Sequence, residues 1–346
     1  MGSKNSIVDK IIFYILQRHH KVNYFIDVFT GGFAVSDYVL QHTNKKVLAN
    51  DFNKYVIALL DKTLKGELPD KIYDWVSRET FMDVKNNPDN YEDWYVGYIL
   101  TIWSFGNSQQ AYMYGKDIEQ DKKNIHNIIV FNKFADEFKN FKKIIPEKIQ
   151  KLDYKRHKEK RNKVLNVLKN YFNEKTLIEN LQRTERLDRV QLYNKDWKRD
   201  KRLDMVQNLA QLERVQNLER LDMVQNLAQL DRVQLYNKDW KDFLKETPHE
   251  VLKDSIIYCD PPYEDTAEYM IDGFNHDEFW QWFRETPYCV YVSSYKAPDD
   301  IEPLNFEYKN QLLSGGVGKV ATENIYWNGK GDYIPTMEDL LFNIKE

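Results

Sequence analysis

Hydrophobic positions at the start of the chain follow first a helical and then a strand-like spacing. Residues 7–18 carry Ile and Leu at helical intervals, which predicts an amphipathic helix. The apolar run 24–29 predicts a strand that ends in Thr30-Gly31-Gly32-Phe33, and a helix-like stretch follows over 34–42. Strand, glycine turn and helix in this order are typical of a nucleotide-binding α/β unit.

A second strand and helix follow directly. Residues 46–49 predict a strand that ends in Asn50-Asp51, and residues 54–64 predict a helix. The second strand thus ends on a carboxylate about 20 residues after the glycines, as in dinucleotide-binding folds.

From residue 66 to about 180 this alternation stops, and aromatic residues and lysines become more frequent. The change predicts an inserted, mainly helical region. Residues 139–169 hold twelve Lys and Arg against three acids, a local charge of +9 (12 − 3). The basic run is either a solvated helix face or a surface that follows phosphates, and the sequence leaves both open.

Residues 181–241 are repetitive. Residues 187–198 recur identically at 230–241, an offset of 43, and residues 202–212 recur at 220–230, an offset of 18. Apolar residues recur every third position here, which gives an α-helix no single apolar face, so a stable lone helix is not expected. We expect residues 194–236 to be surplus to the fold; self-association through the repeat is the second option.

The α/β pattern resumes near the carboxyl end. A buried strand over 255–259 is stopped by Asp260-Pro261-Pro262-Tyr263; a helix over 276–285, a strand over 288–292 and strands around 324–327 are predicted after it. Two prolines fix φ and donate no hydrogen bond, so the loop is stiff and its carbonyls can face a ligand. A carboxylate, a carbonyl and a tyrosine ring together suit the exocyclic amine of a base held out of its duplex.

Composition narrows the class of protein. The chain is 42% hydrophobic and 14% aromatic, which is typical of a globular protein. Its two cysteines, Cys259 and Cys289, exclude a disulfide framework, and we interpret Cys259 as a small buried strand residue. No metal centre is expected from the scattered histidines. Without an apolar run of about 18 residues or a signal peptide, the protein is expected to be cytoplasmic and not membrane-bound. The net charge of −4 does not indicate a nucleic-acid partner by itself.

The order of these motifs resembles the Dam-type DNA adenine-N6 methyltransferases, including phage members, over residues 1–115 and 230–330. Phe33 stands where many members carry a further glycine. The similar segments are Lys4 with its neighbours, Asp27 to Gly32, Asn50-Asp51, Phe105-Gly106-Asn107 to Tyr114-Gly115, Asp239-Trp240 as the acidic end of a strand, Asp260 to Tyr263, Ser293-Ser294-Tyr295 and Thr322-Glu323-Asn324.

The resemblance implies a fold and its domains. We expect a Rossmann-like methyltransferase sheet with an inserted target-recognition region and a repetitive segment. Residues 1–65 and 230–346 would form the catalytic domain, 66–180 the DNA-binding region and 181–241 the repeat. The cofactor would be S-adenosyl-L-methionine, and the partner double-stranded DNA, bound by a monomer.

The resemblance also assigns roles to residues. Asp51 would accept hydrogen bonds from the cofactor ribose, unless it only caps the helix beginning near Asn53. Tyr112 and Tyr114 are either DNA contacts or core residues, and Lys4 is either a cofactor ligand or a frayed end. The catalytic residues would be Asp260, Pro261, Pro262 and Tyr263; the cofactor ligands Lys4, Asp27, Phe29, Gly31, Gly32, Asp51 and Asp260; the DNA contacts Asn107, Tyr112, Tyr114, Lys116, Lys155, Arg156 and Lys158.

The predicted activity is methyl transfer to N6 of a flipped-out adenine. Transfer to cytosine N4 or to an adenine in RNA is the alternative within enzymes. A non-catalytic nucleic-acid-binding module with a self-associating repeat is the alternative from another class. A role in restriction-modification is compatible with the resemblance, which does not specify the recognised DNA sequence.

Overall fold

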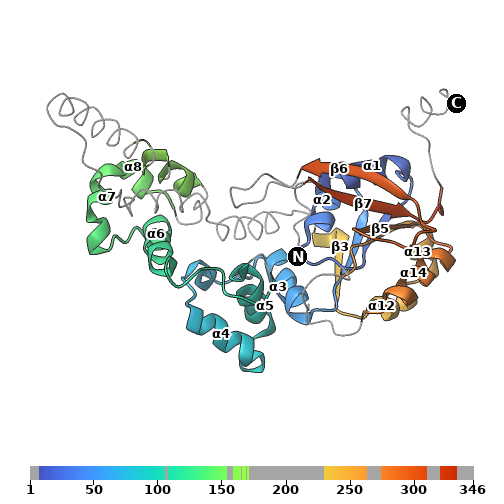
Figure 1. Ribbon diagram of the computed structural model, residues 1–346, viewed down its shortest axis with the longest axis horizontal. Coiled ribbons are helices and arrows are strands. Elements are labelled where there is room, and N and C mark those ends of the chain that lie inside the picture. The colour runs from blue at the N-terminus through green and yellow to red at the C-terminus, as the bar shows by residue number, and fades with distance from the viewer. Residues whose placement is uncertain are drawn as a thin grey trace, which may run out of the picture. The chain divides into compact units, whose positions relative to one another are not determined.

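The computed structural model describes residues 8–105, 108–153, 159–164, 166–168, 170, 230–262, 274–309 and 320–332 (Figure 1). The chain divides into two compact units. Unit 1 comprises Met1–Leu68, Met82–Ala111 and Met223–Glu346, and unit 2 comprises Pro69–Phe81 and Tyr112–Asp222.

Unit 1 contains a seven-stranded sheet with the order β3-β2-β1-β4-β5-β7-β6. The five strands from β3 to β5 run parallel, and β7 pairs antiparallel with both β5 and β6. The sheet therefore confirms the expected mixed α/β class and has a doubly wound parallel core. The strands are β1 Tyr24–Asp27, β2 Lys46–Asn50, β3 Val233–Tyr236, β4 Ser255–Cys259, β5 Val290–Ser294, β6 Pro303–Lys309 and β7 Val320–Trp327.

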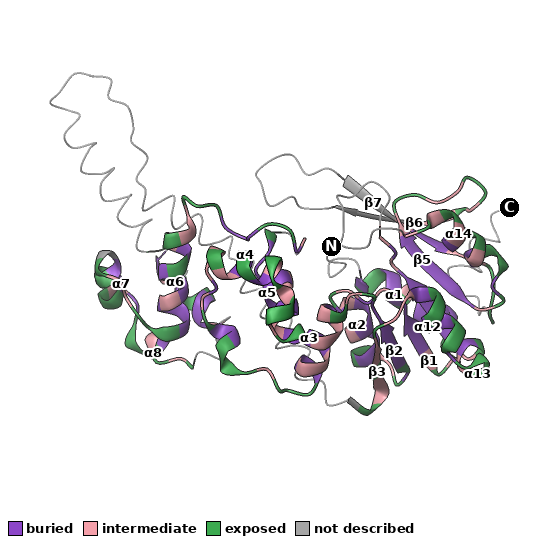
Figure 2. Cartoon of the chain, turned by 90° about the horizontal axis from the view of Figure 1, so that it is seen from below, coloured by how far each residue is buried: buried purple, intermediate pink, exposed green. Residues whose placement is uncertain are grey.

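Alternate residues of the central strands enter two separate cores, one on each face of the sheet. In β4, Ile256 and Tyr258 belong to one core, whereas Ile257 and Cys259 belong to the other. This division follows from the two-residue period of a strand. Because both faces are covered, the central parallel strands are mostly buried. All five residues of β4 are buried, and Figure 2 shows β1, β2 and β5 mainly in the colour of buried residues.

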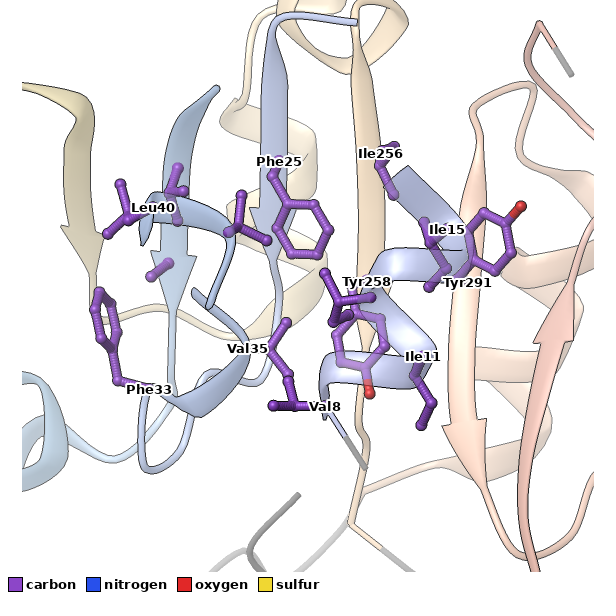
Figure 3. Close-up of a cluster of buried hydrophobic side chains, with 14 of the residues drawn as sticks. Val8, Ile11, Ile15, Phe25, Phe33, Val35, Leu40, Ile256, Tyr258 and Tyr291 are labelled. Atoms are coloured by element: carbon purple, nitrogen blue, oxygen red, sulfur yellow. The ribbon is translucent and has the colours of Figure 1, made fainter. Parts of the chain in front are cut away.

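Helices on each face supply the other half of each core. Figure 3 shows Ile11 and Ile15 of α1 beside Tyr258 and Tyr291 on one face. On the opposite face Phe243, Phe279 and neighbouring aromatic rings pack against the sheet. The helices of these two layers are α1 Val8–Arg18, α2 Ala34–His42 and α3 Lys54–Leu64, and α12 Trp240–Glu246, α13 His249–Lys253 and α14 His276–Glu285.

Helix α5, Asp93–Ile102, packs against α3 at a glycine. A Cβ atom on Gly97 would lie 2.1 Å from the backbone oxygen of Tyr55, so only glycine allows this approach. This contact places α5 in unit 1, although residues 66–180 were expected to form one target-recognition region. The boundary of unit 2 therefore differs from the one expected from sequence.

Unit 2 is helical in its described part, and α4 crosses its boundary with unit 1. None of the described helices is both long and apolar enough to cross a membrane. The remaining elements are α4 Arg78–Asn86, α6 Glu119–Phe131, α7 Lys139–Ile144 and α8 Glu147–Gln150, with short 3-10 helices Asp70–Tyr73, Pro88–Asn90, Asp136–Phe138 and Leu230–Arg232.

The second copy of the long repeat forms the edge of the sheet. Arg232 donates to the backbone oxygens of Leu40, Thr43 and Lys45 at 2.7, 2.6 and 3.1 Å, and β3 then pairs with β2. The first copy, residues 187–198, lies outside the described residues. Because the two copies are identical, removing 194–236 gives the same sequence as removing 187–229, and the twelve residues that form β3 and begin α12 remain.

Candidate active site

The candidate site lies at the carboxyl ends of β1, β2 and β4. Strands β1 and β4 are parallel neighbours, and the chain passes from β1 toward β2 on one side and returns to β4 on the other. Ligands of doubly wound sheets bind outside the carboxyl ends of the strands at such a switch point. Three carboxylates are found there: Asp27 ends β1, Asp51 follows β2, and Asp260 follows β4.

Asp27 is a buried carboxyl with two hydroxyl donors. Its side chain is 1% exposed and accepts hydrogen bonds from Ser36 Oγ at 2.6 Å and Thr30 Oγ1 at 3.1 Å. Burial raises the pKa of Asp27 from 3.8 to about 7, the two hydroxyl donors lower it, and the charges of Asp260 and Asp51 raise it further. Asp51 and Asp260 are thus close enough to Asp27 for their charges to affect it.

The glycine turn after β1 uses left-handed backbone conformations. Gly31 has φ 48° and Phe33 has φ 66°, and the Phe33 side chain is fully buried. A φ in this region favours glycine. Phenylalanine nevertheless occupies position 33 and packs into the core. Among the residues that the structure describes, a Cβ atom on Gly32 would meet nothing within 4 Å.

Asp51 connects this turn to the start of α3. Its Oδ2 accepts from Gly31 N at 2.9 Å, and its Oδ1 accepts from Asn53 N at 2.8 Å. Burial raises the pKa of Asp51, and the two backbone donors lower it. The N-cap of α3 is Asn53, whose side chain accepts from the backbone of Tyr55 and Val56, so Asp51 is not the cap of that helix.

Two asparagines hold the strand ends in place, and neither was predicted as a functional residue. Asn50 donates to the backbone oxygens of Val28 and Lys238, both at 3.1 Å. Asn237 donates to the backbone oxygens of Asp51 and Phe52, both at 2.9 Å. The repeat copy at 230–241 therefore supports the loop that carries Asp51.

The motif after β4 continues a fully buried strand. Pro261 is buried, and Asp260 and Pro262 are half-buried. Burial raises the pKa of the Cys259 thiol well above its ordinary value, and the neighbouring Asp27 and Asp260 raise it further. A thiol in this environment stays protonated, so Cys259 is a core residue rather than a nucleophile.

Two phenylalanines flank the carboxylates. Phe29 is half-buried and its ring lies edge-on to Phe274 and Phe279, with centroids 5.7 and 6.1 Å apart. Phe52, directly after Asp51, is 55% exposed.

The described residues expected to contact DNA lie in unit 2. Lys116 is exposed, whereas Tyr112 and Tyr114 are buried. The Tyr112 hydroxyl donates to Val76 O at 2.7 Å, and the Tyr114 ring stacks on Trp75 at 5.5 Å. For the two tyrosines these contacts favour the core alternative over a direct DNA contact.

One expected feature has a different structure, and several residues lie outside the described part. Asp239 does not end a strand: β3 ends at Tyr236, and the Asp239 side chain accepts from Lys241 N and caps α12, which begins at Trp240. The residues outside the described ranges are Lys4, Asn107, Lys155, Arg156, Lys158 and Tyr263.

A comparison with protein families gives a match over most of the chain. The model of a family described as D12 class N6 adenine-specific DNA methyltransferase matches residues 1–285. The matched range includes β1, β2, β3 and β4 and ends at the last residue of α14. No curated protein matches the chain.

Proposed function

The chain belongs to the D12 class N6 adenine-specific DNA methyltransferase family, and from this membership we propose that it transfers a methyl group from S-adenosyl-L-methionine to a flipped-out adenine. An adenine-specific DNA family argues against the cytosine-N4, RNA and non-catalytic alternatives. The observation that carries the proposal is the position of Asp260-Pro261-Pro262, directly after β4 and beside β1 at the switch point of the sheet.

The charges at the strand ends fit a cationic sulfonium. The charges of Asp51 and Asp260 act on Asp27, and a cation bound nearby would relieve this repulsion. Each oxygen of Asp51 accepts one hydrogen bond from a backbone N–H, so each can still accept a hydrogen bond from a ribose hydroxyl. Gly31, Gly32 and Phe29 would form the turn beneath the cofactor, and Lys4 would pair with its carboxylate.

The chain's own groups would bind and orient the amine. S-adenosyl-L-methionine supplies an electrophilic methyl group. Asp260 and the Pro261 carbonyl would accept hydrogen bonds from the two N6 hydrogens, which would direct the nitrogen lone pair toward that methyl group. In a direct displacement the N6–methyl bond would form as the methyl–sulfur bond breaks, with S-adenosylhomocysteine as the leaving group and one N6 proton released. Positioning and electrostatics would accelerate this step, and Tyr263 would stack on the base.

Unit 2 would supply contacts to the DNA backbone. Exposed cations of the basic run include Lys142, Lys143 and Lys148, and Lys116 is exposed as well. Lysines that neutralise phosphates release counterions, so the affinity for DNA is expected to fall steeply with salt.

Replacing Asp260 tests the proposal. Asp260→Ala is expected to abolish transfer of labelled methyl groups to unmethylated DNA, because one of the two acceptors for N6 is lost. The folded variant should still bind S-adenosylhomocysteine measurably by calorimetry. Asp277→Ala, at an exposed aspartate in the first turn of α14, is the matched control and should keep full activity. Persisting transfer by Asp260→Ala would overturn the mechanism.

A further inference from the structure

Gln109 lies in the loop after α5 and is held more rigidly than a loop residue usually is. Its side chain is 8% exposed, and its backbone has φ 63°. A residue other than glycine adopts this conformation only where its surroundings impose it. Gln109 belongs to unit 1, the unit that also contains the strand-end carboxylates.

Three hydrogen bonds impose the conformation. Gln109 N donates to Ser104 Oγ at 3.0 Å, and Gln109 Nε2 donates to Thr101 Oγ1 at 3.4 Å. Gln109 Oε1 accepts from Asn53 Nδ2 at 3.1 Å. The side-chain amide therefore connects the end of α5 to the start of α3.

Asn53 is the link to the site. Its Nδ2 is bound by Gln109, its Oδ1 caps α3, and its backbone N–H donates to Asp51 Oδ1 at 2.8 Å. The Gln109 bond holds the Asn53 side chain in the position that caps α3, and this cap fixes the Asn53 backbone. A shift of that backbone would move the N–H donor and change the direction of the Asp51 carboxylate. Gly31 N binds the other oxygen of Asp51, so the orientation of the carboxylate depends on the hydrogen bond from Asn53 N.

We propose that Gln109 is a positioning residue for the cofactor, which orients Asp51 through Asn53 so that the carboxylate can receive the ribose hydroxyls. The assignment rests on the proposed function. It also gives Gln109 a role in cofactor binding, whereas the segment Phe105 to Gly115, in which it lies, resembles the opening of a target-recognition region. The long side-chain amide supplies both an acceptor for Asn53 and a donor for Thr101.

Three substitutions test the assignment. Gln109→Met keeps the length of the side chain and removes both of its hydrogen bonds. Gln109→Glu keeps the acceptor for Asn53, and Thr101 can donate to the other oxygen. Gln110→Met makes the same chemical change at the neighbouring exposed glutamine, whose contacts are with Lys85.

The readout is the dissociation constant for S-adenosylhomocysteine, measured by calorimetry at a temperature where circular dichroism shows every variant to be folded. Gln109→Met should raise this constant about fivefold to tenfold, as expected for a lost buried hydrogen bond. Gln109→Glu and Gln110→Met should stay within about twofold of the wild type. Affinity for DNA in the absence of cofactor should not change, which a general loss of structure would not predict.

If Gln109→Met does not fold, Asn53→Ser replaces it, because serine keeps the helix cap but lacks the donor to Gln109. The same loss of affinity is expected. Unchanged affinity in the folded variant, or a loss that Gln109→Glu does not restore, would overturn the assignment. Failure of the wild-type protein to bind S-adenosylhomocysteine would instead overturn the proposed function.

Discussion

The buried carboxyl of Asp27 should make the stability of the protein depend on pH in an unusual direction. Burial raises its pKa in the folded protein from 3.8 to about 7. Below about pH 4 the carboxyl is protonated in both the folded and the unfolded state, so its burial does not lower the free energy of unfolding through this shift. As the pH rises from about 4 to 7 the unfolded chain releases this proton and the folded protein retains it, so the free energy of unfolding falls. Above about pH 7 the full cost is present, about 4 kcal/mol for a shift of about 3 units.

Asp27→Asn removes this dependence and keeps an acceptor for Ser36 and Thr30. Relative to the wild type, the variant's free energy of unfolding should increase by about 2.5 kcal/mol between about pH 5 and pH 8, measured by urea denaturation without cofactor. Asp61→Asn, at a half-exposed aspartate paired with Lys65, is the matched control. The reasoning is refuted if the Asp27→Asn and wild-type curves remain parallel.

Three further predictions concern packing and the repeat. Gly97→Ala should lower the free energy of unfolding by about 1–3 kcal/mol, because its Cβ meets Tyr55 O, whereas Gly32→Ala should leave it unchanged; equal effects in thermal denaturation would contradict this packing. Arg232→Ala should lower the free energy of unfolding by about 2 kcal/mol, because its hydrogen bonds to three backbone oxygens are lost. Arg189→Ala, at the equivalent position of the first repeat copy, should leave it almost unchanged; a larger effect at Arg189 than at Arg232 would place the first copy in the sheet. Deletion of 194–236 should leave a folded, active protein of 303 residues, and an inactive or insoluble product would make the repeat structural. Light scattering with and without those residues tests self-association.

The strand ends were predictable from sequence because each strand is short, apolar and stopped by polar residues. Asp27, Asp51 and Asp260 follow runs that are buried on both faces, and parallel strands bring their carboxyl ends to one edge. Their common location could therefore be inferred without knowing any contact. The strand order could not be inferred from sequence, because β2 pairs on its outer side with β3, which follows it by more than 180 residues.

The supporting residues were not predictable, because their roles arise from contacts between distant segments. Asn237 directly follows the 43 residues that were expected to be surplus, and nothing in the sequence indicates that its amide supports the Asp51 loop. Gln109 shows no pattern in the sequence around it, and only its bond to Asn53, 56 residues away, indicates a role. The need for glycine at position 97 could not be predicted either, because the Tyr55 backbone that requires it lies on another helix.

Phe33 shows how a departure from a motif can preserve its geometry. Its left-handed φ of 66° is the conformation that a glycine would adopt most easily at this position. The side chain that replaces that glycine is fully buried in the core formed with α1, α2 and the sheet. The strain of the backbone is thus offset by apolar burial. The turn keeps its path, Gly31 N still reaches Asp51, and the missing glycine does not argue against a cofactor site at this turn.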